Sequence, residues 1–303
     1  MNRRTFLAAS STAIAFPYLT RAADKKLRVG VIGHTGRGNY GHGIDTVWMN
    51  VPDTEIVAVA DAHEGGLANA KKKLKISKGF GDYHAMLKEI RPDIVAVCPR
   101  HADQHHDMSL AAIEAGAKGI YIEKPFVRTP AEADSLVAAC KKHNAKLAVA
   151  HRNRYHPLLK VIDKYLAEGK LGKVLEIRGR GKGDRRGGDE DLWVLGSHVL
   201  NLIHYFGGTP RNCSARMFKN GNPVTAADVK EGSEGLGPLA SNELHARYEM
   251  GRGFTAYFDS IANDDTQNHG FGLHIIGSKG LIAIRNDRHP LAHLVPGNPF
   301  GPT

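Results

Sequence analysis

One short segment of the chain combines the residue types that hold a phosphate group. It reads GHTGRG at residues 33–38 and continues to Gly41, so residues 36–41 fit the spacing G-x-G-x-x-G. A backbone that approaches a pyrophosphate closely cannot carry bulky side chains, and the amides at the start of a following helix then face the anion. The segment predicts a dinucleotide-binding turn with cofactor contacts at Gly33, Thr35, Gly36, Arg37 and Gly38.

An acidic residue follows the turn at the spacing expected for ribose recognition. Asp61 lies 20 residues beyond Gly41, directly after the apolar run at 55–60. A carboxylate there accepts hydrogen bonds from both adenine-ribose hydroxyls and repels a 2′-phosphate, so its position favours NAD over NADP. The alternative role of Asp61 is an N-cap of the next helix.

Further polar residues follow two later apolar runs. Pro99 ends the run at 93–98, and Glu123, Lys124 and Pro125 end the run at 119–122. In doubly wound folds, ligands bind outside the carboxyl ends of the strands. We therefore expect these residues to face a bound ligand.

The elements that must position these residues follow from the hydrophobic pattern. Short apolar runs at 27–32, 55–60, 93–98, 119–122 and 146–150 alternate with helical stretches at 44–48, 64–75, 83–89, 103–115 and 130–144. This alternation is typical of a parallel sheet covered on both faces. It predicts an α/β fold in which residues 24–150 form a doubly wound Rossmann domain.

Composition and the first residues exclude several classes of protein. The 303-residue chain has a formal charge of +10 and three cysteines without a CxxC pair, so neither a disulfide framework nor a zinc ribbon is encoded. It lacks the roughly 20 consecutive apolar residues of a membrane-spanning helix. No aromatic residues interleave with its lysine runs, so nucleic acid is not an expected partner.

Residues 1–23 predict an export signal, and Arg3-Arg4 looks like the twin-arginine type.

The order of these motifs resembles the family of glucose-fructose oxidoreductase, inositol dehydrogenase and MocA. The resemblance rests on the glycine turn, Asp61, Pro99 and the Glu-Lys-Pro triplet at 123–125, and it extends from about residue 27 to about residue 285. It implies that residues 151–303 form a second α/β domain with an open, mostly antiparallel sheet for substrate binding and assembly. Strand-like segments at 174–180, 244–248, 254–258, 273–276 and 281–284 and a helix at 198–206 are compatible with this.

The resemblance also implies roles for individual residues. Lys124 matches the family lysine that holds the substrate hydroxyl, and His198 matches the family histidine that acts as acid and base. Pro99 and Glu123 match positions near the cofactor. Arg154 is a candidate substrate contact, with a packing role as the alternative. No metal is implied. The family members act on sugars or cyclic polyols with NAD or NADP, and a homodimer or homotetramer is expected.

The chain departs from the family pattern beside His198. Val194 stands where an Asp is common four residues before the histidine, and Asn201 stands where an Asp is common three residues after it. One of the acidic residues 189–191 is a candidate replacement. Histidines 101, 105 and 106 with Asp107 are interpreted as pocket lining or a helix start, with metal binding as the alternative. The basic segment 185–188 is either a substrate contact or an exposed loop.

These patterns lead to one preferred function and two alternatives. The preferred function is an exported, NAD-dependent sugar or polyol dehydrogenase in which Lys124 and His198 handle the hydroxyl. The second is a glycosidase that retains NAD, oxidises C3 transiently, eliminates the aglycone and reduces the ring again. The third is a non-catalytic sugar- or nucleotide-binding protein, suggested by Val194 in place of the acid.

Overall fold

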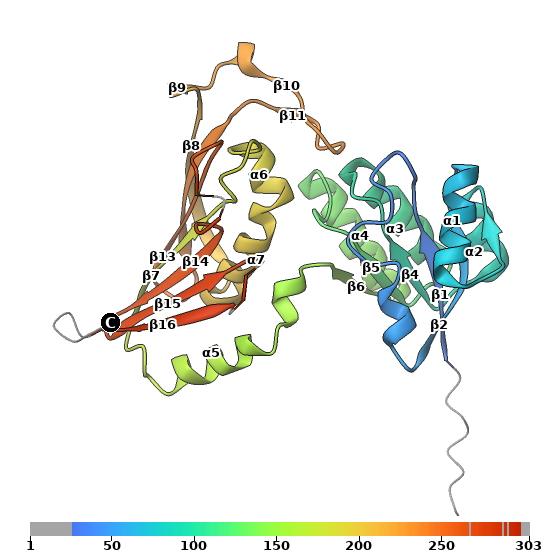
Figure 1. The fold of residues 1–303 in the computed structure, drawn as a ribbon, viewed down its shortest axis with the longest axis horizontal. Coiled ribbons are helices and arrows are strands. Elements are labelled where there is room, and N and C mark those ends of the chain that lie inside the picture. The colour runs from blue at the N-terminus through green and yellow to red at the C-terminus, as the bar shows by residue number, and fades with distance from the viewer. Residues whose placement is uncertain (1–25, 267, 287, 290, 298–303) are drawn as a thin grey trace, which may run out of the picture.

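The chain folds into two domains joined near residue 150 (Figure 1). The computed structural model describes residues 26–266, 268–286, 288–289 and 291–297. Residues 1–23, expected to form the export signal, lie outside them. In the described ranges, no helix has the length and apolar character needed to cross a membrane.

The N-terminal domain contains a six-stranded parallel sheet in the order β3-β2-β1-β4-β5-β6. Because strand order reverses between β1 and β4, this edge of the sheet has the crevice in which doubly wound folds bind ligands. The predicted Rossmann fold is confirmed. Its strands are β1 (Leu27–Ile32), β2 (Thr54–Ala60), β3 (Gly79–Phe80), β4 (Ile94–Val97), β5 (Gly119–Ile122) and β6 (Lys146–Val149), and its α-helices are α1 (Glu64–Leu74), α2 (Tyr83–Ile90), α3 (His105–Glu114) and α4 (Pro130–His143).

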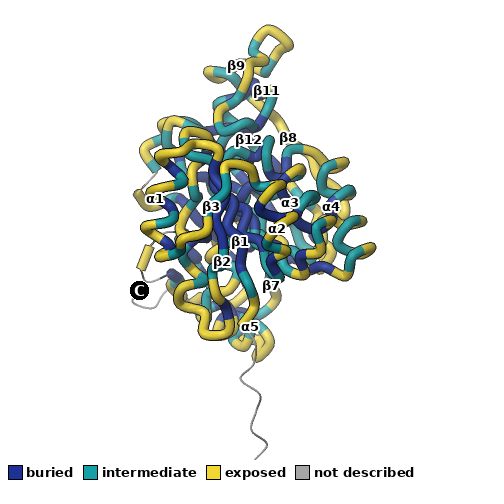
Figure 2. The backbone as a smooth tube through the Cα atoms, turned by 90° about the vertical axis from the view of Figure 1, so that its right-hand side faces the viewer, coloured by how far each residue is buried: buried dark blue, intermediate teal, exposed yellow. Residues whose placement is uncertain are grey.

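Burial on both faces of the sheet explains why the strands are continuous apolar runs. In β4, Val95 and Val97 pack in a cluster with residues of α2, α3 and α4. Ala96, and Cys98 just after the strand, pack on the opposite side with residues of α1 and with Ile44. The central strands are accordingly buried in Figure 2.

The prediction of a helix at 44–48 is wrong. Residues 40–46 form turns, and only a short 3-10 helix, Val47–Asn50, follows them. Gly41 and Gly43 have φ values of +60° and +88°, which are incompatible with a right-handed helix. The segment directly after the turn at 33–38 is therefore an irregular loop rather than the start of a helix.

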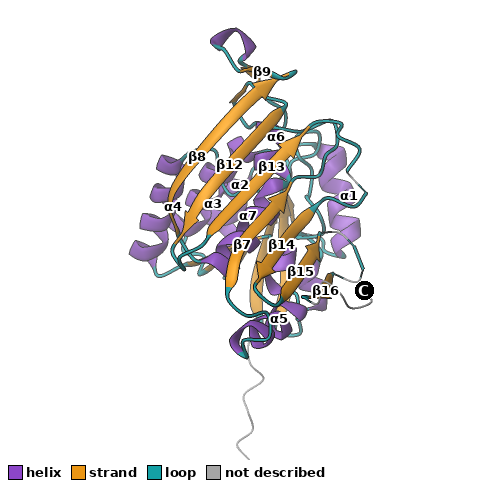
Figure 3. Ribbon diagram, turned by 90° about the vertical axis from the view of Figure 1, so that its left-hand side faces the viewer, coloured by secondary structure: helices purple, strands orange, loops and turns teal. Residues whose placement is uncertain are grey.

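The C-terminal domain contains an eight-stranded mixed sheet in the order β16-β15-β14-β7-β13-β12-β8-β9, in which only the β7–β13 pair is parallel. The predicted mostly antiparallel sheet is confirmed. One face packs on helices and the other is uncovered (Figure 3). Its elements are α5 (Leu158–Ala167), β7 (Val174–Arg180), α6 (Asp189–Val194), α7 (Gly196–Gly207), β8 (Pro210–Lys219), β9 (Asn222–Pro223), β12 (Glu243–Met250), β13 (Thr255–Ile261), β14 (Gly272–Gly277), β15 (Gly280–Arg285) and β16 (Ala292–Pro296).

Residues 220–240 form an arm that leaves this sheet and returns toward the Rossmann domain (Figure 1). The arm contains a short hairpin of β10 (Lys230–Glu231) and β11 (Pro238–Leu239). Its tip is bound to the first domain, because the backbone N–H of Ala102 donates to the carbonyl of Glu234 at 3.0 Å. Leu236 packs beside this bond against Ala102 and Val194. The arm thus connects the two domains a second time.

Candidate active site

Two cavities open at the carboxyl edge of the six-stranded sheet, on either side of the glycine turn. The first, of about 390 Å³, is called the acidic cavity, and Gly33 forms part of its wall. The second, of about 310 Å³, is called the basic cavity and has walls from both domains. The charged residues of the acidic cavity are Asp61, Asp82, Asp103, Asp107 and Arg37; those of the basic cavity are Glu123, Lys124, Arg152, Lys182 and Arg186.

The glycine turn between the cavities fits the close approach of a dinucleotide. A Cβ atom on Gly33 would lie 2.2 Å from the Tyr40 ring, and one on Gly38 would lie 2.4 Å from the backbone nitrogen of Arg100. Gly36, at φ +84°, has open space where its Cβ would be. Gly33 and Gly38 thus allow the turn to pack closely on Tyr40 and Arg100, and Gly36 leaves backbone open to the close approach of a phosphate.

Asp61 is buried at the floor of the acidic cavity, only 2% exposed, and holds the turn in place. Its carboxylate accepts hydrogen bonds from the Thr35 hydroxyl at 2.7 Å and the Tyr40 hydroxyl at 2.8 Å, and from the backbone N–H of Thr35 and His63. Burial acts to raise the pKa of Asp61, but these hydrogen bonds outweigh it and lower the pKa. His63, not Asp61, caps helix α1, so the N-cap alternative is wrong.

Pro99 and Glu123 both lie against the glycine turn. The Glu123 carboxylate is buried against Gly41 and accepts a long hydrogen bond, 3.4 Å, from the backbone N–H of His42. Next to Pro99, the backbone N–H of Arg100 donates to the Gly38 carbonyl at 3.2 Å. Both predicted residues therefore contact the turn, although Glu123 faces the loop rather than the Lys124 ammonium.

Lys124 extends from the end of β5 across to the second domain. Its side chain is 4% exposed, and its Nζ donates to the backbone carbonyl of Val194 at 2.9 Å. Burial lowers the pKa of Lys124, and the nearby negative charge of Glu123 partly opposes the shift. An ammonium has three N–H donors, so two remain for a ligand in the basic cavity.

His198 also lines the basic cavity and is paired with a histidine that sequence analysis missed. The Nδ1 atoms of His198 and His151 lie 3.4 Å apart, and the rings meet edge to face. Burial, followed by the positive charges around them, lowers the pKa of His198 to about 3 and that of His151 to about 4. Both imidazoles are neutral at pH 7, so one donates Nδ1–H to the other. The only signal for His151 was its place directly beyond the last strand-like run.

Within the described ranges, no acidic side chain hydrogen-bonds to His198 in place of the aspartate that the resemblance implies. Val194 is buried among Ala102, Leu236 and Leu239, so its side chain supports the arm and its carbonyl holds Lys124. The acids at 189–191 do not hydrogen-bond to His198 but hold other loops. Asp189 accepts from the backbone of residues 240 and 241, Glu190 accepts from Ser233, and Asp191 accepts from Ser260 and from the backbone of Lys182.

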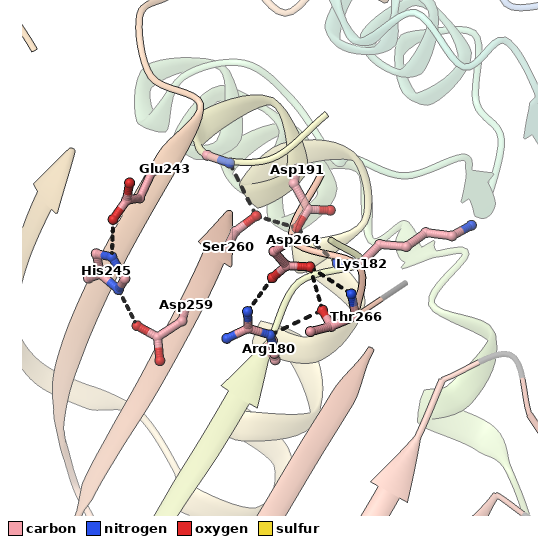
Figure 4. Close-up of polar contacts among 10 residues, drawn as sticks. Arg180, Lys182, Asp191, Glu243, His245, Asp259, Ser260, Asp264 and Thr266 are labelled. Carbon is pink, nitrogen blue, oxygen red and sulfur yellow. Dashed lines mark hydrogen bonds and ion pairs between the residues drawn. The ribbon is translucent and has the colours of Figure 1, made fainter. Parts of the chain in front are cut away.

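Asp191 holds the loop that carries Lys182, a residue of the basic cavity (Figure 4). Its carboxylate accepts from the Ser260 hydroxyl at 2.6 Å and from the backbone N–H of Lys182 at 3.2 Å. Burial raises the pKa of Asp191 to about 6. The same Ser260 hydroxyl accepts from the backbone N–H of Gly188 at 3.1 Å, so both ends of the loop 182–188 are fixed.

Of the remaining candidates, Arg186 lines the basic cavity and Asp107 the acidic cavity, whereas Arg154 and His105 line neither. The Arg154 guanidinium stacks at 4.4 Å from the centre of the Tyr205 ring, and Arg152 reaches the basic cavity instead. His105 is fully buried, and its two ring nitrogens lie 2.7 Å from the carbonyl oxygens of Pro99 and Pro125. Among the residues the structure describes, no group of three or more His, Cys, Asp or Glu side chains could hold a metal ion.

Comparison with known proteins agrees with this geometry. Residues 27–151 match the Gfo/Idh/MocA family model, described as an oxidoreductase family with an NAD-binding Rossmann fold. Levoglucosan dehydrogenase of Pseudarthrobacter phenanthrenivorans is 24% identical over 76% of this chain and 65% of its own length. Myo-inositol 2-dehydrogenase of Thermotoga maritima is 28% identical over 51% of this chain and 45% of its own. The matches span less than two thirds of each relative.

A solved structure shows that the likeness extends through both domains. Levoglucosan dehydrogenase in complex with NADH and levoglucosan superposes with a TM-score of 0.71 at 21% identity, covering 91% of this chain and 77% of that one. At this identity the match concerns the fold. Residues 27–151 therefore form an NAD-binding Rossmann domain that matches the Gfo/Idh/MocA family model.

Proposed function

We propose that the protein transfers a hydride between NAD and a hydroxyl-bearing carbon of a sugar or cyclic polyol. The observation that carries the proposal is the meeting of Lys124 and His198, from different domains, in one cavity beside the glycine turn. The relatives named as levoglucosan and myo-inositol dehydrogenases support the substrate class.

The residues of the cavity suit the proton part of such a reaction. NAD, when bound, supplies the hydride acceptor. The two unused N–H groups of Lys124 can donate to the substrate hydroxyl and steady the negative charge that develops on its oxygen. His198 is neutral and can accept the hydroxyl proton, and the Nδ1 contact with His151 orients the ring.

A turnover screen tests this proposal. The purified protein is mixed with NAD and a panel of sugars and polyols, and NADH is followed at 340 nm, an absorbance wavelength of the reduced cofactor. Net NADH with at least one free sugar or polyol supports the dehydrogenase. Cofactor binding without turnover of any member would favour the non-catalytic binding protein and contradict the proposal.

The NAD-retaining glycosidase remains the second candidate because of the arm. The arm binds Ala102 beside Asp103 and Gln104, which line the acidic cavity, and this contact would slow the release of a bound nucleotide. Protein purified without added NAD is denatured with acid, and the released nucleotide is quantified. Stoichiometric NAD together with cleavage of aryl glycosides and no net NADH would favour the glycosidase.

Export and assembly are further proposals. Residues 1–23 would direct the folded protein out of the cytoplasm, so N-terminal sequencing of exported protein should begin at Asp24. Replacing both arginines, Arg3→Lys with Arg4→Lys, should retain the protein inside. The uncovered face of the eight-stranded sheet is the proposed homo-oligomer surface. Light scattering after gel filtration should give a dimer or tetramer, and a monomer mass would contradict this.

A further inference from the structure

The basic cavity carries an unbalanced positive charge. Lys124 enters it from the first domain, and Arg152, Lys182 and Arg186 enter it from the second, against one carboxylate in its lining, Glu123. That carboxylate is buried against the glycine turn. Neutral sugars require hydrogen-bond donors and acceptors but no such excess of cations.

The second-domain cations differ in how far the protein neutralises them. The Arg186 guanidinium donates two hydrogen bonds to the Asp184 carboxylate, from Nε to Oδ1 at 3.1 Å and from Nη2 to Oδ2 at 2.5 Å. The Lys182 ammonium has no hydrogen bond or ion pair with any residue that the structure describes. Its backbone is nevertheless fixed by Asp191, and its side chain extends away from that network (Figure 4). Asp184 lies near enough for its pKa to be lowered by the charge of Lys182, but that carboxylate is already paired with Arg186. Lys182 is therefore a cation on a fixed backbone whose ammonium has no hydrogen-bond partner within the described residues.

A third cavity, of about 230 Å³, extends the basic surface away from the glycine turn. It shares Lys182 with the basic cavity and is further lined by Arg285, Arg288 and His269. Its lining within the described ranges contains no carboxylate. The Lys182 ammonium thus lies where the two cavities meet, on the second-domain side and apart from the turn that would hold the cofactor phosphates.

The positive charge also acts on the histidine pair. After burial, the charges of Lys124 and Arg152 contribute to the low pKa of His198. A histidine with this pKa is a weak base at pH 7. An anion bound among these cations would offset their effect and make His198 a better proton acceptor.

We propose that the substrate is an anionic carbohydrate, a sugar carrying a carboxylate or a phosphate ester, and that Lys182 binds its anionic group. The inference rests on the proposed oxidoreductase function, since it places the reacting hydroxyl at Lys124 and His198. Charge-assisted hydrogen bonds are roughly twice as strong as neutral ones, so the anionic group would dominate substrate selection.

Matched pairs of ligands and variants test the proposal. D-Glucose, D-glucuronate and D-glucose 6-phosphate are titrated calorimetrically into protein loaded with NADH, and NADH formation is measured separately with NAD. We expect one anionic sugar to bind at least about ten-fold tighter than glucose, and Lys182→Gln to remove about ten-fold of that affinity. Lys182→Arg should retain most of it. Arg185→Gln, at an exposed neighbouring cation outside both cavities, should change nothing.

Comparing D-glucuronate with D-glucose 6-phosphate shows whether the site prefers a carboxylate or a phosphate. The preference for the anionic sugar over glucose should shrink as the salt concentration increases. Equal or tighter binding of glucose than of both anionic sugars overturns the inference. So does a Lys182→Gln variant that loses affinity for NADH rather than for the sugar. Lys182-dependent anion binding without any NADH formation supports the anionic site and contradicts the proposed function. NADH formation with neutral sugars alone supports the proposed function and contradicts the anionic site.

Discussion

The acidic and basic cavities lie on opposite sides of one glycine turn but carry opposite charges. The acidic cavity has four carboxylates and one arginine, whereas the basic cavity has four cations and one carboxylate. Both adjoin loops at the same edge of the Rossmann sheet, and the basic cavity has a further wall from the second domain. The shared edge therefore determines that ligands bind there, and the loop residues determine which charge each half accepts.

The two cavities also differ in how far ion pairs and hydrogen bonds within the protein compensate their charged side chains. In the acidic cavity, Asp61 accepts hydrogen bonds from Thr35 and Tyr40, and Asp103 is paired with Arg37. In the basic cavity, Arg186 is paired with Asp184, but within the described residues the hydrogen bond of the Lys124 ammonium goes to a neutral carbonyl. The acidic side is thus a preformed binding surface that disfavours an additional phosphate, and the basic side is completed by its ligand.

The largest effect is expected for Lys124→Met. This change keeps the buried stem but removes the ammonium, so turnover should fall by about 10²–10³-fold or more. NAD affinity, measured by fluorescence titration, should stay within about three-fold, because Lys124 belongs to the basic side. Lys170→Met, an exposed lysine outside both cavities, is the control. Retained turnover would remove Lys124 from the reaction.

Asp61→Ser should act on the acidic side alone. Removing the carboxylate leaves the Tyr40 hydroxyl and the Thr35 amide without their partner, which should cost about 2–3 kcal/mol of unfolding free energy in urea. If Asp61 also contacts the ribose, the ratio of NAD to NADP affinity should fall about ten-fold. Thr35→Val, which removes one partner but keeps the carboxylate, separates the two roles. If the affinities for NAD and NADP fall equally, Asp61 holds the turn but does not contact the ribose.

The histidine pair should make the basic side sensitive to acid. Because the folded-state pKa of His198 is about 3 and the ordinary value is 6.5, the unfolded chain gains protons that the folded protein excludes as pH falls below 6.5. Stability is therefore lost between pH 6.5 and pH 3, by about 2 kcal/mol from His198 at pH 5. Urea unfolding of His198→Gln should show a smaller loss between pH 7 and pH 5. His204→Gln, on the exposed side of the same helix, should show the same loss as the parent protein.

The sequence predicted the Rossmann sheet well because its signals are local. Central strands such as β4 are buried on both faces, so a short run of apolar residues is enough to indicate them. The helix expected at 44–48 failed because a distant residue decides the local conformation. Glu123 occupies the space that a Cβ on Gly41 would need, and Gly41 takes a left-handed conformation there.

The basic cavity was predicted only in part, for a related reason. Lys124 and His198 were identified from their position in the chain relative to the glycine turn. The role of the Val194 carbonyl, the pairing of His151 and the wall formed by Lys182 all depend on how the second domain and its arm meet the first. Contacts between domains leave no periodic signal in either segment, so hydrophobic patterning could not reveal them.

The smallest effect is expected at the rim of the acidic cavity. The Asp107 side chain lines this cavity but is 78% exposed, so water and salt screen most of its repulsion of a phosphate. Asp107→Asn should raise NADP affinity only about two-fold, and the gain should vanish in high salt because exposed charges contribute little. Glu114→Gln, an exposed acid at the other end of α3, should leave the affinity unchanged. A ten-fold gain at Asp107 would mean that the rim, rather than the buried Asp61, sets the cofactor preference, and the contrast between the two cavities would then rest on exposed charges.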